Sequence, residues 1–104
     1  MATRNTLSKN PPIHPGEILR DVFGDAGISA SAAASRMRVP ANRFTAIMQG
    51  RRSITADTAL RLARFFGTSA QMWMNLQSNY ELDRAEYESA KRIEREVRPL
   101  RKAS

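Results

Sequence analysis

Apolar residues recur with helical spacing in five segments of the chain. The first helix is predicted to begin at Pro15, which suits the first helical position, and to end at Gly27. Its apolar stripe consists of Ile18, Leu19, Val22 and Phe23. Strand-like alternation of apolar and polar residues is absent from the sequence. The pattern therefore predicts an all-α fold.

Two short helices are predicted next, over residues 30–37 and 41–49. Ser29 suits the N-cap of the first, and Gly50 ends the second. Pro40 separates the two helices, because the residue before a proline disfavours the helical conformation. The residues expected to face inward are Ala33, Ala34 and Met37 in the first helix and Phe44, Ile47 and Met48 in the second.

Two further helices complete the pattern. The fourth is predicted to follow Thr55 as its N-cap and to end at Gly67. Thr68 and Gln71 have the spacing of a capping box, which predicts the start of a fifth helix. The faces expected to be apolar carry Leu60, Leu62, Ala63 and Phe66 in the fourth helix and Trp73, Leu76, Gln77 and Tyr80 in the fifth.

The charge of the chain is strongly positive and unevenly spread. The 104 residues suit one domain, and 17 Lys and Arg against 10 Asp and Glu give a formal net charge of +7. This charge indicates a polyanionic partner, such as nucleic acid or a membrane surface. Residues 41–54 carry three arginines and no acid, whereas residues 81–90 are acidic and residues 91–104 are basic again. The basic tail is interpreted as a solvated helix face or a frayed end.

The composition excludes several classes of site. Cysteine is absent, and His14 is the single histidine, so thiolate sites and multi-histidine metal sites are ruled out. His14 is interpreted as a helix-entry residue. No apolar run approaches the roughly 20 residues of a membrane span, and no secretory segment is present. We therefore expect that the protein is not an enzyme and that it binds no metal, cofactor, small-molecule substrate or membrane. We also expect a cytoplasmic location.

The two short helices and the turn between them have the dimensions of a helix-turn-helix motif. Ala34 provides the small residue that a close helix crossing needs, and Met37 and Val39 flank the turn. The outer side of the second helix then faces the DNA major groove, where amide and guanidinium groups bind base edges. The residues expected to contact bases are Ala41, Asn42, Arg43, Thr45 and Gln49. Those expected to contact phosphates are Ser29, Ser31, Arg51, Arg52 and Ser53.

Some of these residues have a second interpretation. Arg43 could instead form an ion pair with an acidic residue of the first helix. Arg51 and Arg52 have an alternative interpretation as a solvated pair on the surface. Arg38 occupies the turn, so either it adopts a left-handed conformation or the turn differs in shape.

The uncharged stretch over residues 69–80 is the predicted dimer surface. Its exposed contacts are expected to be Trp73, Leu76 and Tyr80, although at helical spacing Trp73 also suits the core. The domain organisation predicted from these features is a flexible arm over residues 1–12, a helix-turn-helix domain over 13–88 and a basic helical extension or tail over 89–104.

Four strings of this sequence, in this order, also resemble a known family. They are IHPGE at 13–17, VPANRF at 39–44, GRRSITADTALRL at 50–62 and FGTSAQMWMNLQ at 66–77. The chain is similar through them to the HigA/VapI-type antitoxins of the lambda-repressor-like (Xre) class, over roughly residues 13–88. Two positions depart from the pattern, since family members usually carry glycine at position 38 and often a basic residue at position 41.

The resemblance implies a five-helix lambda-repressor-like domain with an extended C-terminal helix. It also implies a homodimer that binds a palindromic operator in double-stranded DNA, represses its own operon and neutralises a RelE-like mRNA-endonuclease toxin. The alternative is a stand-alone Xre-family transcriptional regulator without a toxin partner.

Overall fold

The computed structural model describes residues 12–101, and helices account for most of them. Five α-helices follow one another: α1 (Pro15–Ala26), α2 (Ala30–Met37), α3 (Arg43–Met48), α4 (Ala56–Phe66) and α5 (Ala70–Glu96). No strand occurs between residues 12 and 101. The prediction of an all-α, five-helix fold with a long last helix is confirmed. The predicted arm over 1–12 lies, except for Pro12, outside the described residues.

Side-chain caps define where four of the helices begin. His14 Nδ1 accepts the N–H of Gly16 at 2.9 Å, and Ser29 Oγ accepts that of Ala32 at 3.1 Å. The Thr55 hydroxyl caps α4 in the same way. These bonds satisfy N–H groups that have no partner within the helix itself. The predicted N-caps at Ser29 and Thr55 are therefore confirmed.

The start of α5 differs from the prediction by one residue. Ser69, rather than Thr68, is the N-cap, and its Oγ accepts the N–H of Met72 at 3.0 Å. The Thr68 hydroxyl instead accepts a hydrogen bond of 2.8 Å from the indole N–H of Trp73. The predicted capping box of Thr68 and Gln71 is therefore wrong, because Ser69 is the N-cap and the Gln71 side chain donates forward to Oδ1 of Asn75.

The turn between α2 and α3 is longer than predicted. Residues 40–42 form a turn, closed by a hydrogen bond of 2.9 Å from the N–H of Arg43 to the carbonyl of Pro40, so α3 begins at Arg43. Arg38 has φ 61° and ψ 47°, the left-handed conformation, which was one of the two alternatives for this turn. The N–H of Val39 then reaches the carbonyl of Ala34, as in a glycine-terminated helix end.

The core lies where α1 to α4 meet the first turns of α5. It consists of Leu19, Phe23, Ala33, Ala34, Met37, Phe44, Ile47, Ile54, Ala59, Leu62 and Trp73. Leu60 was predicted on the buried face of α4 but is 63% exposed, so that prediction is wrong. Ala59 and Thr58 take the inner positions instead, because α4 is rotated so that its 58–59–62 face meets α2 and α5.

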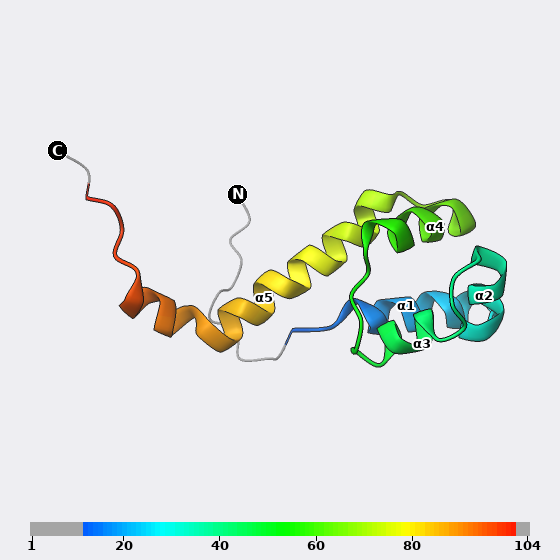
Figure 1. Cartoon of the computed structure of the whole chain (residues 1–104), viewed down its shortest axis with the longest axis horizontal. Coiled ribbons are helices and arrows are strands. Elements are labelled where there is room, and N and C mark those ends of the chain that lie inside the picture. Colours follow the sequence, from blue (N-terminus) through cyan, green and yellow to red (C-terminus); the bar gives the residue numbers. More distant parts are fainter. Residues whose placement is uncertain (1–11, 102–104) are drawn as a thin grey trace.

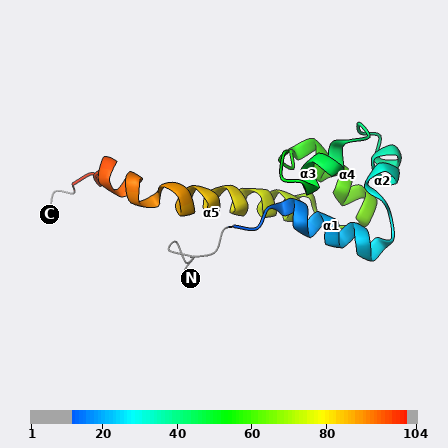
Figure 2. The same ribbon diagram turned by 90° about the horizontal axis from the view of Figure 1, so that it is seen from below.

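Helix α5 extends well past the body formed by the other helices, as Figures 1 and 2 show from two sides. Its 27 residues give the described part of the chain dimensions of 58 × 25 × 24 Å. Only Trp73 and Gln77 of this helix are buried. Farther along α5, the large apolar side chains of Leu82, Tyr87 and Ile93 are exposed, and those of Val97 and Leu100 are exposed after the helix ends. None of the helices between residues 12 and 101 combines the length and the apolar character that a membrane span requires.

Candidate nucleic-acid interface

The helix-turn-helix motif is formed by α2, the turn after it and α3. Phe44, Ala46 and Ile47 of α3 are buried, and α3 packs on α1 and α2. Three polar residues lie on the opposite side, at positions i, i+3 and i+7: Asn42, Thr45 and Gln49. Asn42 and Gln49 are exposed, and Thr45 is half-buried. Ala41 is exposed beside them. Four of the five residues predicted to contact bases thus lie on or next to one accessible surface.

A close backbone contact between α1 and α3 fixes how this surface is presented. A Cβ atom placed on the buried Gly16 would overlap the carbonyl oxygen of Ile47 and lie 2.8 Å from the Cα of Met48. Only glycine therefore allows the first turn of α1 to cross the end of α3 at this distance. The role of Gly16 was missed from the sequence, because the element that it contacts is some thirty positions away.

The fifth predicted base contact, Arg43, is turned inward. Its Nη1 donates a hydrogen bond of 3.0 Å to the hydroxyl of Thr58, which is fully buried in α4. The alternative role, an ion pair with an acid of the first helix, is wrong, since the partner that the structure gives Arg43 lies in α4. Arg43 is half-buried, whereas Asn42 before it is exposed.

Arg20 of α1 makes a second contact with α3 that was not predicted from the sequence. Its Nη2 donates to the carbonyl of Met48 at 3.2 Å, from α1 to the last residue of α3. Like Thr58, it lies far from α3 in the chain, so hydrophobic periodicity and helix-capping patterns carry no signal for either contact.

The residues predicted to contact phosphates lie at both ends of the motif. Ser31, Arg51, Arg52 and Ser53 are exposed, and Ser29 is exposed while capping α2. Arg51 donates from Nε and Nη2 to Oε1 of Gln49, at 2.9 and 2.6 Å. This pair of bonds holds the Arg51 guanidinium beside the end of α3.

The predicted dimer residues have three different environments. Trp73 is fully buried in the core of the single chain, so the prediction that it lies exposed on a dimer surface is wrong. Its alternative interpretation as a core residue is confirmed. Leu76 and Tyr80 are half-buried, and the Tyr80 ring packs edge-on against His14 with centroids 4.7 Å apart.

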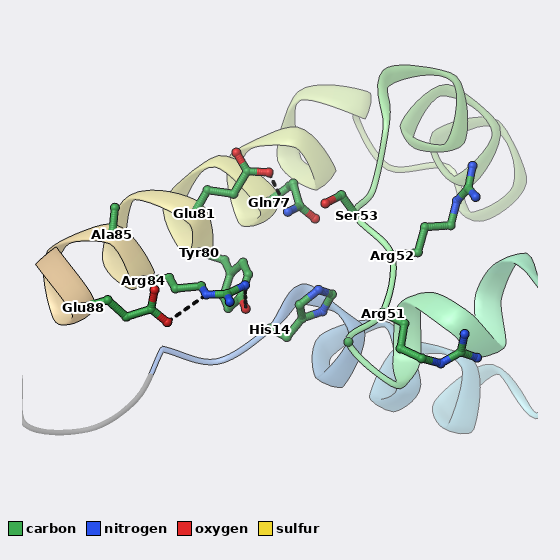
Figure 3. Close-up of a pocket in the computed structure, with 11 residues that line it drawn as sticks. His14, Arg51, Arg52, Ser53, Gln77, Tyr80, Glu81, Arg84, Ala85 and Glu88 are labelled. Atoms are coloured by element: carbon green, nitrogen blue, oxygen red, sulfur yellow. Dashed lines mark hydrogen bonds and ion pairs between the residues drawn. The ribbon is translucent and has the colours of Figure 1, made fainter.

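A cavity of about 400 Å³ opens between the start of α1, the loop after α3 and α5. Figure 3 shows His14, Tyr80 and Gln77 facing it, while the side chains of Arg51 and Arg52 point away from α5. Gln77 is satisfied on both sides, because Oε1 accepts from the N–H of Ile54 at 2.8 Å and Nε2 donates to Glu81 at 2.9 Å. Gln77 thus holds the loop after α3 onto α5.

The electrostatics of this region favour a neutral His14. Burial lowers its pKa below the ordinary value of 6.5, the nearby Glu17 opposes this shift and Arg84 adds to it. The Nδ1 atom that caps α1 can accept the Gly16 N–H only in the neutral form. Over residues 12–101, no group of three or more His, Cys, Asp or Glu side chains is arranged to hold a metal ion.

Comparisons with known proteins agree with this geometry. The helix-turn-helix domain family matches residues 16–72. Virulence-associated protein I of Dichelobacter nodosus is 51% identical over 77 residues, which are 73% of this chain and 71% of that protein. The chain belongs to the HigA/VapI family of helix-turn-helix antitoxins.

Solved structures of this family have the same architecture. An addiction module antidote protein of the HigA family from Coxiella burnetii is 52% identical, with a TM-score of 0.82 over 88% of this chain and all of that one. The Pseudomonas aeruginosa antitoxin HigA, solved with the higBA promoter, is 50% identical, with a TM-score of 0.82 over 86% of this chain and 98% of that one. HigA/VapI proteins are DNA-binding proteins rather than enzymes.

Proposed function

We propose that this HigA/VapI family member is an antitoxin that binds operator DNA and represses its own operon. The observation that carries the proposal is its likeness, at 50% identity, to an antitoxin solved with its promoter. The exposed side of α3 supports it, because Asn42, Thr45 and Gln49 place polar side chains of the kind that bind base edges on one accessible side of the motif. This function implies action in the cytoplasm, where bacterial operators are found.

Base reading and backbone binding are assigned to different residues. Asn42, Thr45 and Gln49 contact base edges, with Ala41 beside them against an apolar group such as a thymine methyl. Ser29 and Ser31 at the start of α2 and Arg51, Arg52 and Ser53 after α3 contact phosphates, which fix the position of the motif without reading sequence.

The protein acts as a homodimer. One recognition helix reads only a few base pairs, and two half-sites about 34 Å apart give a palindromic operator its affinity. Because Trp73 is buried, the dimer contact shifts to half-buried Leu76 and Tyr80 and to the exposed apolar residues farther along α5. Light scattering at micromolar concentration tests this, and a monomer there would refute it.

The toxin partner is proposed on the family relationship alone. A RelE-like toxin encoded next to this gene binds the protein and is silenced. Co-expression of the two genes tests this, since growth arrest by the toxin should be relieved and the two proteins should co-purify. Persistent toxicity would instead favour a stand-alone transcriptional regulator.

Two substitutions test the assignment of residues on DNA. Asn42→Ala should weaken operator binding by roughly 1–3 kcal/mol and leave binding to a scrambled duplex unchanged. Arg51→Gln should weaken both duplexes and lower the slope of log K against log salt by about one. Arg64→Gln, an exposed arginine of α4 outside the proposed dimer contact, is the control for the loss of one positive charge and should leave the salt slope at its wild-type value. The assignment fails if Asn42→Ala weakens both duplexes equally.

A further inference from the structure

The recognition helix is too short to hold its own direction. Helix α3 has six residues, less than two turns, and isolated helices shorter than about 12–15 residues are marginal in water. Its orientation is therefore set by what it contacts. Phe44 and Ile47 anchor its inner face in the core, and an arginine is bonded at each of its two ends.

The N-terminal end of α3 is bonded to α4. Arg43, the first residue of α3, donates through Nη1 to the Thr58 hydroxyl at 3.0 Å. Thr58 is fully buried, and its hydroxyl also lies 3.3 Å from that of its neighbour Thr55. The acceptor is therefore fixed in the core, and a hydrogen bond from a charged donor to it is among the stronger ones.

The C-terminal end of α3 is bonded to α1. The carbonyls of Thr45, Ala46 and Ile47 accept from the N–H groups of residues 49, 51 and 50, at 3.0, 2.9 and 3.0 Å. The carbonyl of Met48 accepts from the side chain of Arg20 at 3.2 Å. Arg20 thus completes the set of terminal carbonyls and places a positive charge at the negative end of the helix.

We propose that Arg43 and Arg20 are positioning residues that set the orientation of α3 on DNA, and that neither contacts DNA itself. The two bonds lie at opposite ends of α3 and reach different helices, so loss of either lets α3 tilt about the other. A tilt moves Asn42, Thr45 and Gln49 off their base edges, whereas Arg51 and Arg52 on the following loop still reach phosphates. This inference rests on the proposed DNA-binding function and assigns Arg43 a role other than base contact.

The test separates the Arg43 bond from the Arg43 charge. Thr58→Val removes the acceptor hydroxyl, keeps the shape of the side chain and leaves Arg43 intact, and Thr58→Ser keeps the hydroxyl. Arg43→Gln removes the charge and the bond together. Arg20→Gln and Arg20→Lys form the second pair, since lysine retains a charged donor. Arg64→Gln, an exposed arginine of α4, controls for the loss of one positive charge. Each variant is titrated at several salt concentrations with the duplex that the wild-type protein selects from a randomised pool, and with a scrambled duplex.

We expect Thr58→Val and Arg20→Gln each to lower the ratio of selected to scrambled affinity about tenfold, which equals the discrimination of one base contact. The salt slope should stay at its wild-type value, Thr58→Ser and Arg20→Lys should restore most of the ratio, and Arg64→Gln should leave it unchanged. The single buried Trp73 reports whether each variant is folded. Arg20 is exposed, so its variants carry the test if Thr58→Val does not fold.

Three results would overturn the inference. An unchanged ratio in folded Thr58→Val and Arg20→Gln would show that the bonds stabilise the fold only. A salt slope lowered by about one in Arg20→Gln, or a ratio lost in Arg43→Gln but kept in Thr58→Val, would show direct contact of that arginine with DNA. If the wild-type protein selects no sequence at all, the proposed function fails rather than this inference.

Discussion

Replacing Gly16 by alanine should separate α1 from α3, and Gly24 in the same helix provides a matched control. A Cβ at Gly16 would meet the backbone of Ile47 and Met48, which cannot rotate away as a side chain can. A Cβ at Gly24 meets no atom within 4 Å. The same chemical change is thus made twice in one helix, once with a clash and once without.

The two substitutions should shift stability in opposite directions. Overpacking costs about 1–3 kcal/mol, and a clash with backbone places Gly16→Ala at the upper end. Alanine recovers up to about 1 kcal/mol over glycine in a helix, which leaves a net loss of ~2 kcal/mol. Gly24→Ala should gain about 0.5–1 kcal/mol for the same reason. For a domain of this size the melting temperature should fall by about 8–16 °C and rise by about 2–8 °C respectively.

Urea and thermal unfolding, followed by the fluorescence of the single buried Trp73, measure both variants against the wild type. Folded Gly16→Ala should also bind the operator less tightly than Gly24→Ala, because α3 is displaced from α1. Wild-type stability in Gly16→Ala, or an equal loss in both variants, would refute the close crossing as the reason for glycine at position 16.

Two further predictions concern helix ends. Because the folded pKa of His14 lies below 6.5, the unfolded chain binds the proton more readily, and stability should fall as the pH drops below about 6.5. His14→Asn keeps a capping acceptor that does not titrate, so its free energy of unfolding should change less between about pH 7 and 5 than that of the wild type. Urea unfolding at a series of pH values measures this, and the same pH dependence in both proteins would contradict it. Arg38→Gly should raise stability by about 1 kcal/mol by relieving the left-handed backbone, whereas Arg36→Gly inside α2 should lower it by about as much. Destabilisation by both in the same unfolding assay would argue against backbone strain at Arg38.

The helices themselves were largely predictable, because helix start and stop signals are local. The caps at Ser29 and Thr55 and the left-handed glycines at positions 27 and 67 act within one turn of the backbone, and all lie where the sequence indicated. The error at Thr68 is also local, since Trp73, whose indole N–H donates to the Thr68 hydroxyl, lies only five residues farther along the chain. Thr68 and Ser69 are both competent caps, and the choice fell to Ser69 while the Trp73 indole occupies the Thr68 hydroxyl.

The outer face of the recognition helix was also predictable, since apolar positions at Phe44 and Ile47 leave Asn42, Thr45 and Gln49 on the other side. The wrong predictions in α4 and α5 concern which residues of each helix are buried against the other helices. Leu60 is exposed and Thr58 buried because the rotation of α4 follows from its contacts with α2 and α5. Trp73 is in the core because α5 places its first turns, rather than its later ones, against the body of the domain.

The sequence alone thus determined the number and order of the helices, the helix-turn-helix motif and the positive charge that suits DNA, because periodicity, caps and composition act over a few residues. Only the tertiary structure decided how the recognition helix is held. The contacts of Arg43 with Thr58, Arg20 with Met48 and Gly16 with Ile47 join positions 15 to 31 residues apart. Such pairs leave no periodic trace in the sequence, because they form only when separate helices pack and leave charged donors and terminal carbonyls to be satisfied.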